Sequence, residues 1–123
     1  MTEKFITPLI FKMKTNKTKI YIAGKVTGEP KHFCILKFAT AQKELEKQGY
    51  EVVNPIEVVG DFNADWETAM RKCIKALMDC DAIYMLPDWH DSKGAKIEHS
   101  LAIDLSLAFV RLSELNQRLM NHM

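Results

Sequence analysis

Hydrophobic positions in this chain alternate between short continuous runs and repeats of three to four residues. Residues 19–23 form the first run, which is β-branched and aromatic and is followed by a glycine. Such a run ending in a turn residue is typical of a strand. Over residues 34–45 the apolar positions are instead spaced by four, three and four residues. This spacing predicts an amphipathic helix, which Gly49 ends.

The same alternation continues through the middle of the chain. Residues 51–53 predict a short second strand that an Asn-Pro pair stops, and residues 56–64 predict a loop. Asp65 is expected to cap a helix whose apolar residues recur at intervals of four and three as far as Cys80. Residues 82–86 are nearly all apolar, as expected for a third strand buried on both faces.

The last third of the chain leaves one alternative open. A polar loop at 87–91 leads into a helix that Ser92 opens. Beyond Asp104 this helix either continues, or a serine breaks it and residues 107–111 form a fourth strand. The compact Ala-Phe-Val sequence favours the strand. Ser113 could then cap a tail helix with Leu115, Leu119 and Met120 inward.

Strands that alternate with helices predict right-handed crossovers and a parallel sheet. We therefore expect an α/β fold, a small Rossmann-like or flavodoxin-like three-layer sandwich with about four strands in the order 2-1-3-4. Connections leave the first and third strands in opposite directions, and ligands bind at such a switch point, outside the carboxyl ends of the strands. The loops at 24–30 and 87–92 meet there.

Composition narrows the class of protein. The chain has 123 residues, is 47% hydrophobic and 27% charged, and carries a net charge of +1. These values predict one globular domain, with residues 1–17 as a flexible tail, and no nucleic-acid or membrane partner. Three cysteines and four histidines lack metal-ligand or redox spacing, so we expect no metal, no cofactor and reduced thiols in the cytoplasm.

Glu98 is the strongest candidate for a functional residue. Its same-face neighbours at three and four residues are small or apolar: Gly94, Ala95, Leu101 and Ala102. A carboxylate on that face points toward the core beside the predicted crevice, and burying it is costly unless it serves a purpose. The alternative is a partly exposed glutamate at the edge of the helix face.

The loop after the first strand offers donors for an anion. Gly24, Lys25, Thr27 and Gly28 supply backbone amides, an ammonium and a hydroxyl. An ordinary strand-to-helix turn would explain the same residues. Ser92 is a second candidate anion ligand, although N-capping alone would account for it.

The loop before Ser92 holds further candidates. Asp88 and Asp91 could orient a sugar hydroxyl or transfer a proton, or they could be solvated loop aspartates. Trp89 could stack on a base or cover the core.

Three segments resemble the nucleoside 2-deoxyribosyltransferase superfamily. They are residues 19–24, residues 49–55, and the segment from Ser92 to Ala102 with its Gly-Ala pair and Glu98. The closest branch is a group of small domains of unassigned function, and the 2′-deoxynucleoside 5′-phosphate N-hydrolases are more distantly similar. The resemblance covers residues 19–112 and implies a single domain of this kind over 18–123.

The resemblance implies a retaining N-glycosidic reaction on a nucleoside or nucleotide. Glu98 matches the nucleophile that attacks C1′, Ser92 a contact to the 5′-phosphate, and residues 24–28 the phosphate-facing loop. Tyr21 lies in the matching first strand, and Gly94 in the matching helix start. The superfamily's sites often borrow residues from a neighbouring subunit, which implies a homodimer or a higher homo-oligomer.

Cys73 departs from this pattern. The related enzymes carry an Asp eight residues before the Asp that precedes the third strand, and here that position is Cys73. A thiol is a weak proton donor compared with a tuned carboxylic acid. Proton transfer has therefore passed to Asp88 or Asp91, or it has been lost. The leading hypothesis is an enzyme that cleaves or exchanges the N-glycosidic bond of a (deoxy)nucleoside 5′-monophosphate, and the alternative is a non-catalytic nucleotide-binding protein.

Overall fold

The computed structural model describes residues 17–112. In this part of the chain the strands are β1 (Lys19–Ala23), β2 (Glu51–Val53), β3 (Ala82–Met85) and β4 (Ala108–Phe109). They form one sheet in the order β2-β1-β3-β4, and every neighbouring pair is parallel. The predicted α/β fold and strand order are confirmed.

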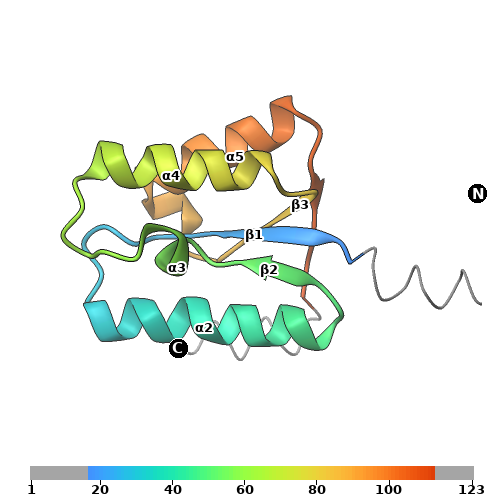
Figure 1. Cartoon of the computed structure of the whole chain (residues 1–123), viewed down its shortest axis with the longest axis horizontal. Coiled ribbons are helices and arrows are strands. Elements are labelled where there is room, and N and C mark those ends of the chain that lie inside the picture. The colour runs from blue at the N-terminus through green and yellow to red at the C-terminus, as the bar shows by residue number, and fades with distance from the viewer. Residues whose placement is uncertain (1–16, 113–123) are drawn as a thin grey trace, which may run out of the picture.

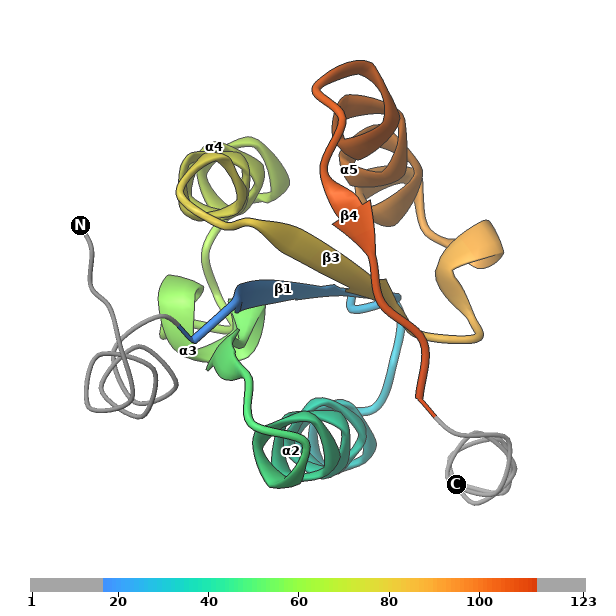
Figure 2. The same cartoon turned by 90° about the vertical axis from the view of Figure 1, so that its right-hand side faces the viewer.

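Helices cover both faces of this sheet. The longest, α2 (Lys31–Lys47), lies against one face, and α4 (Trp66–Met78) and α5 (Lys93–Asp104) lie on the other (Figures 1 and 2). Two shorter elements, α3 (Pro55–Val59) and the 3₁₀ turn η1 (Trp89–Asp91), lie within connections between strands and helices. The result is the expected three-layer sandwich.

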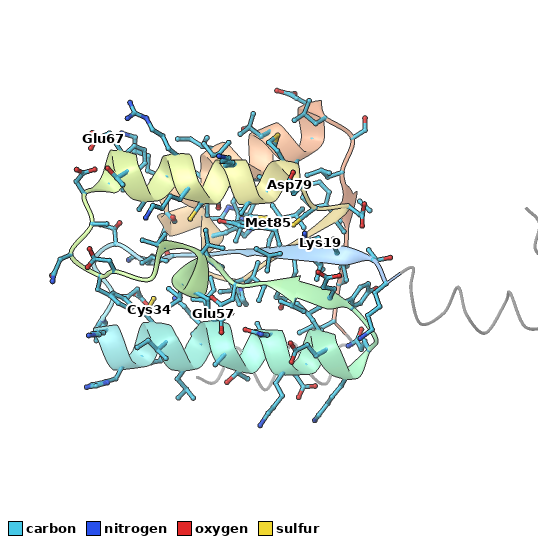
Figure 3. All side chains as sticks on the ribbon, in the orientation of Figure 1. Lys19, Cys34, Glu57, Glu67, Asp79 and Met85 are labelled. Atoms are coloured by element: carbon cyan, nitrogen blue, oxygen red, sulfur yellow. The ribbon has the colours of Figure 1, made fainter. Side chains whose placement is uncertain are left out.

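Successive residues of β1 point into two different cores. Ile20 and Ile22 belong to the hydrophobic cluster on the α2 side, whereas Tyr21 belongs to the cluster formed with α4 and α5. Figure 3 shows the same sidedness in the helices, with Cys34 on the side of α2 that faces the sheet and Glu67 on the outer side of α4. Because strand side chains alternate between faces, this register directs the Tyr21 side chain toward α4 and α5.

The prediction of a loop over residues 56–64 is wrong in its first part, because residues 55–59 form the helix α3. Asn54 caps this helix by accepting a hydrogen bond from the Ile56 amide, Pro55 occupies its first turn, and Gly60 ends it with a φ of 70°. These are the residues that favour a helix start and stop. The Asn-Pro pair therefore both stops β2 and begins a helix.

Other boundaries differ slightly from the prediction. The third strand ends at Met85 and not at residue 86, and β4 is confined to Ala108–Phe109 within the predicted 107–111. Ser106, which has a φ of 59°, separates α5 from this strand as predicted. The predicted tail helix after Ser113, and all but Lys17 of the predicted N-terminal tail, lie outside the described residues. Between residues 17 and 112 no helix is long and apolar enough to cross a membrane.

Candidate functional site

A cavity of about 390 Å³ opens beyond the carboxyl end of β1. Its walls come from the β1–α2 loop, from α3 with the loop after it, and from the N-terminal halves of α4 and α5. This is the switch-point location predicted from the sheet order, and the volume suits a small organic ligand. Seven of the residues predicted for the site line it: Tyr21, Gly24, Thr27, Gly28, Ser92, Gly94 and Glu98.

Glu98 is buried in the wall of this cavity, with only 4% of its surface exposed. Its Oε2 accepts a hydrogen bond of 2.7 Å from the Tyr21 hydroxyl. Burial raises the pKa of Glu98 to about 7, and the Tyr21 hydrogen bond opposes this shift. A carboxylate in this state is poorly solvated yet substantially ionised at neutral pH, the condition in which it is a good nucleophile.

A third ionisable group lies beside this pair. Cys73, on α4, lines the same cavity and interacts electrostatically with Tyr21 and Glu98. Burial, with Glu98 nearby, raises the pKa of Tyr21 well above its ordinary value. Burial likewise raises the pKa of the Cys73 thiol to about 11. Both groups are therefore protonated at neutral pH, and Glu98 is the member of the three that ionises there.

Ser92 and the β1–α2 loop lie on the same cavity. Ser92 caps α5, because its side chain accepts a 3.0 Å hydrogen bond from the Ala95 amide, and its hydroxyl hydrogen can still be donated. Within residues 17–112, the amides of Val26, Thr27 and Gly28 carry no hydrogen bond. Three unpaired amides in succession can bind an anion when their loop curves around it.

Two glycines of the site are required by packing. A Cβ on Gly24 would lie 2.9 Å from the Cβ of Leu86, so the end of β1 passes directly against the residue after β3. A Cβ on Gly94 would lie 2.7 Å from the Met70 sulfur, where α5 approaches α4. Both glycines line the cavity, and both also allow a close approach that shapes it.

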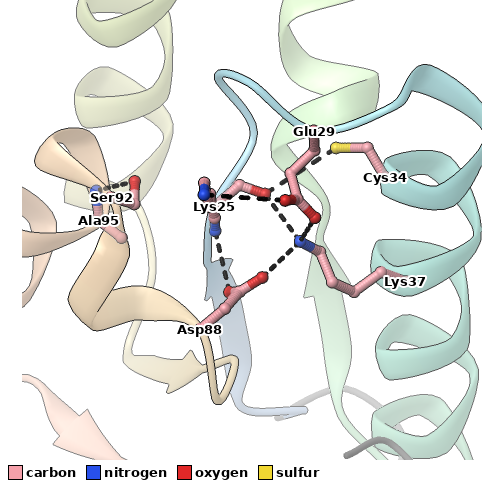
Figure 4. A network of polar contacts seen from close by, with 7 residues as sticks. All are labelled: Lys25, Glu29, Cys34, Lys37, Asp88, Ser92 and Ala95. Carbon is pink, nitrogen blue, oxygen red and sulfur yellow. Dashed lines mark hydrogen bonds and ion pairs between the residues drawn. The ribbon is translucent and has the colours of Figure 1, made fainter. Parts of the chain in front are cut away.

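Four other predicted site residues do not line the cavity: Lys25, Asp88, Trp89 and Asp91. Asp88 is bound elsewhere (Figure 4): its Oδ1 accepts a 3.1 Å hydrogen bond from the Lys25 amide, and its Oδ2 pairs with the Lys37 ammonium. Asp91 lies in η1 and is exposed. The structure therefore does not bring the two loop aspartates together with Glu98.

Trp89 packs as a structural residue. Its ring stacks on that of His99, with 4.1 Å between the centroids, and lies 3.9 Å from the His90 ring. It also packs against the hydrophobic cluster shared by β1, α4 and α5. This placement matches the alternative that Trp89 covers the core, and stacking on a base stays a prediction.

The comparisons with known proteins give a family. The model of a domain of unknown function, DUF4406, matches residues 18–111. The chain belongs to this family. No curated protein and no solved structure matches it significantly.

Lys37 is a buried charge of the DUF4406 domain that the sequence analysis missed. Only 8% of its surface is exposed, and its ammonium donates to the Lys25 carbonyl oxygen at 2.9 Å, to Glu29 at 3.0 Å, and to Asp88. The signal was present, because Lys37 lies three residues after Cys34 and four before Ala41 on the apolar stripe of α2. A lysine at such a position is as informative as a glutamate on a small-residue face.

The opposite wall of the DUF4406 cavity is apolar. Five of its residues were not predicted for the site: Ile56, Val59, Phe62, Trp66 and Met70. Ile56, Val59 and Phe62 come from the unpredicted α3 and the loop after it, where no hydrophobic period was visible. Trp66 and Met70 belong to the predicted apolar repeat of α4, which gave them a place in the core and not at the site. An apolar wall facing a few polar groups is typical of a cavity that holds a small organic ligand.

Charge is unevenly distributed around this cavity. The described lining contains three carboxylates, Glu29, Asp61 and Glu98, and no lysine or arginine. Two lysines outside the lining lie over aromatic rings of the cavity wall. The Lys93 ammonium lies 4.3 Å from the centroid of the Trp66 ring, and the Lys31 ammonium lies 5.3 Å from the centroid of the Phe62 ring. Among the described residues no cluster of three His, Cys, Asp or Glu could hold a metal ion.

Proposed function

We propose that this DUF4406 domain cleaves or exchanges the N-glycosidic bond of a (deoxy)nucleoside 5′-monophosphate. The observation that carries the proposal is the buried Glu98 in the wall of the cavity, hydrogen-bonded by Tyr21. Its motif resembles that of the nucleoside 2-deoxyribosyltransferase superfamily, in which the matching glutamate is the nucleophile. The cavity volume of about 390 Å³ is compatible with a nucleotide.

The reaction has two displacements at the sugar carbon C1′. In the first, a Glu98 carboxylate oxygen bonds to C1′, and the electron pair of the C1′–N bond leaves with the base, which takes up a proton. In the second, water or another base attacks C1′, gives up a proton to the solvent and releases the carboxylate, which balances the proton that the leaving base takes up. Two displacements at one carbon retain its configuration. Tyr21 holds Glu98 in place and favours its ionised form.

Phosphate recognition rests on the β1–α2 loop and the start of α5. The unpaired amides of residues 26–28 and the Ser92 hydroxyl are donors at one cavity. The amino end of α5 adds a favourable field for an anion. These groups match the phosphate-facing positions of the nucleotide hydrolases that the chain resembles. The aromatic wall of Phe62 and Trp66 is left for the base.

A second candidate function is binding without catalysis. The observation that favours it is Cys73, which stands where related enzymes carry an aspartate. Because the pKa of its buried thiol is raised to about 11, Cys73 is a poor donor of the proton that a leaving base needs. Such a protein would keep the cavity and hold a nucleotide or a nucleotide-derived signal. Cytoplasmic location and a homo-oligomeric state stay predictions under both candidates.

Release of free base tests the proposal. Wild-type protein is incubated with a panel of nucleosides and their 5′-monophosphates, and free bases are detected by chromatography. We expect Glu98→Gln to lower turnover by at least about 10²–10⁴-fold, because it removes the nucleophilic charge and keeps the shape. Glu46→Gln, at an exposed position near the end of α2, serves as the control.

Three results separate the candidates. A Glu98→Gln protein with near-normal base release would exclude Glu98 as the nucleophile. Wild-type protein that releases no base, yet is stabilised against heat by monophosphates, would support the binding protein. Neither release nor stabilisation would exclude both.

A further inference from the structure

The β1–α2 loop is tied to the β3–η1 loop through one buried ammonium. Lys37, on α2, donates to the backbone oxygen of Lys25 and to the carboxylates of Glu29 and Asp88. Asp88 also accepts the amide hydrogen of Lys25, 63 residues away in sequence. Figure 4 shows these residues converging from three segments of the chain on the Lys37 ammonium.

All three hydrogens of the Lys37 ammonium are used by these contacts. Lys25 adds a second cation 3.9 Å from the Glu29 carboxylate, so two lysines face two carboxylates and the network is neutral. Burial lowers the pKa of Lys37, but its hydrogen bonds and ion pairs with Asp88 and Glu29 raise it overall. A buried ion network of this kind favours one arrangement of its members, because each charge is costly to bury unpaired.

The network holds the loop at both ends of its exposed turn. Lys25 precedes the unpaired amides of residues 26–28, and Glu29 follows them. Glu29 also donates its own amide hydrogen to the Val26 oxygen at 3.1 Å, which closes the turn. Gly28, Glu29 and Thr27 line the cavity, whereas Lys37 and Asp88 do not. Lys37 therefore contacts the loop without lining the cavity itself.

We propose that Lys37 is a positioning residue for the candidate site, which acts with Asp88 to hold the β1–α2 loop in the conformation that receives the anionic group of the ligand. This inference rests on the proposed function for the identity of that ligand. It assigns Asp88 a role in placing the loop and not in proton transfer. Neither Lys37 nor Asp88 touches Glu98, so the effect of Lys37 falls on ligand binding more than on the chemical step.

The test compares Lys37→Met with wild type, with Lys37→Arg, and with Lys43→Met as the control on an exposed position of the same helix. Methionine keeps the apolar stem and removes the ammonium, so Glu29 and Asp88 lose their shared partner. Amide hydrogen exchange at Lys25 reports the loop directly, because its hydrogen bond to Asp88 depends on where that carboxylate is held. The Leu86 amide, bonded to the Ala23 oxygen in the sheet, reports the core.

We expect Lys37→Met to lose protection at Lys25 while Leu86 keeps it. In the base-release assay we expect kcat/KM for 5′-monophosphates to fall about 10- to 100-fold, mainly through a higher KM. Nucleosides without the phosphate should lose less. Lys37→Arg should restore part of both readouts, because it keeps the charge and the donors in a different geometry.

Distinct results decide between this inference and the proposed function. If Lys37→Met keeps normal Lys25 protection, or keeps a normal kcat/KM with only a lower melting temperature, the positioning role is excluded. If wild type releases no base, the proposed reaction fails alone, and the loss of monophosphate-induced thermal stabilisation in Lys37→Met still supports the role of Lys37. If wild type also fails to bind monophosphates, both are excluded.

Discussion

Folding buries the Glu98 carboxyl and thereby disfavours its ionised form. The pKa of this carboxyl rises from 4.5 to about 7 because the native protein buries it. The folded state then holds the proton more tightly than the unfolded chain, so the stability contribution of Glu98 is fully present below pH ~4.5 and is lost as pH rises to ~7. This penalty is consistent with the proposed role of Glu98 as a nucleophile.

Glu98→Gln should therefore stabilise the protein above neutral pH. A shift from 4.5 to about 7 corresponds to about 3 kcal/mol of lost stability at pH 8. Glutamine is neutral and can still accept the Tyr21 hydrogen bond. Urea unfolding at pH 8 should show the variant more stable than wild type, with a difference that shrinks toward pH 4.5. A difference of equal size at both pH values would contradict the buried ionised carboxylate.

Tyr21 should set the pH at which Glu98 becomes active. Its hydrogen bond lowers the pKa of Glu98 against the larger effect of burial, so Tyr21→Phe should raise that pKa further. We expect kcat/KM of wild type to rise with pH through about 7, and the rising limb of Tyr21→Phe to move to higher pH. Tyr50→Phe, which alters a half-buried tyrosine outside the cavity lining, should leave the midpoint unchanged. If the pH midpoint of kcat/KM is the same in Tyr21→Phe as in wild type, Tyr21 does not influence the ionisation of Glu98.

Individual residues were predictable from sequence where their type conflicted with their position. Glu98 was found because a carboxylate lay among small residues, and Lys37 was missed because only the apolar members of its helix stripe were counted. Asp88 carried no such conflict. Its partner is a lysine 51 residues away on α2, and no spacing along one helix or strand reveals a contact between a loop and a distant helix.

At the scale of single elements, hydrophobic period was a good guide to the longer ones. The 17 residues of α2 and the 13 of α4 span several turns each, enough for a three-to-four repeat to be visible. The five residues of α3 span little more than one turn. Its only signals were its caps, Asn54 with Pro55 at the start and Gly60 at the end, and these signals also fit a loop.

The packing of β1 against β3 gives a prediction at this scale. Gly24→Ala should destabilise the protein by about 1–3 kcal/mol, because the new Cβ would lie 2.5 Å from Leu86 Cδ1 and 2.9 Å from its Cβ. The clash involves the first side-chain carbon, which cannot move without the β3 backbone. Thermal unfolding should show the loss, and Thr27→Ala, at an exposed loop position, should change stability by less than about 0.5 kcal/mol. Equal melting temperatures for both variants would contradict this close approach.

At the scale of the whole molecule, the sheet order creates the candidate site. β1 and β3 are neighbours, and their connections leave toward opposite faces, to α2 and to α5 (Figure 2). The β1–α2 loop and the start of α5, about 65 residues apart in sequence, therefore share one cavity. This location followed from the alternation of strands and helices alone. The far wall did not, because part of it comes from the segment between β2 and α4, where no period was visible, and part from the first turns of α4, whose apolar repeat predicted only a core.

The same arrangement predicts a preference for phosphorylated ligands. The lining carboxylates Glu29, Asp61 and Glu98 oppose an anion. Glu29, however, is paired with Lys37, and the pKa of Glu98 is raised to about 7. The unpaired amides of residues 26–28, Ser92 and the α5 terminus should then outweigh the remaining charge. Nucleoside 5′-monophosphates should bind more tightly than the matching nucleosides.

Thermal unfolding measures this preference without requiring turnover. A ligand at 100 times its Kd stabilises the native state by about 2.7 kcal/mol, a shift of several degrees or more for a domain of this size. With Glu98→Gln, which does not consume the ligand, monophosphates should raise the melting temperature at concentrations where nucleosides do not. Inorganic phosphate should reduce the difference by competing for the same donors. If nucleosides stabilise the protein as strongly as their monophosphates, the β1–α2 loop and Ser92 do not form a phosphate site, and the apolar wall with Glu98 accounts for binding alone.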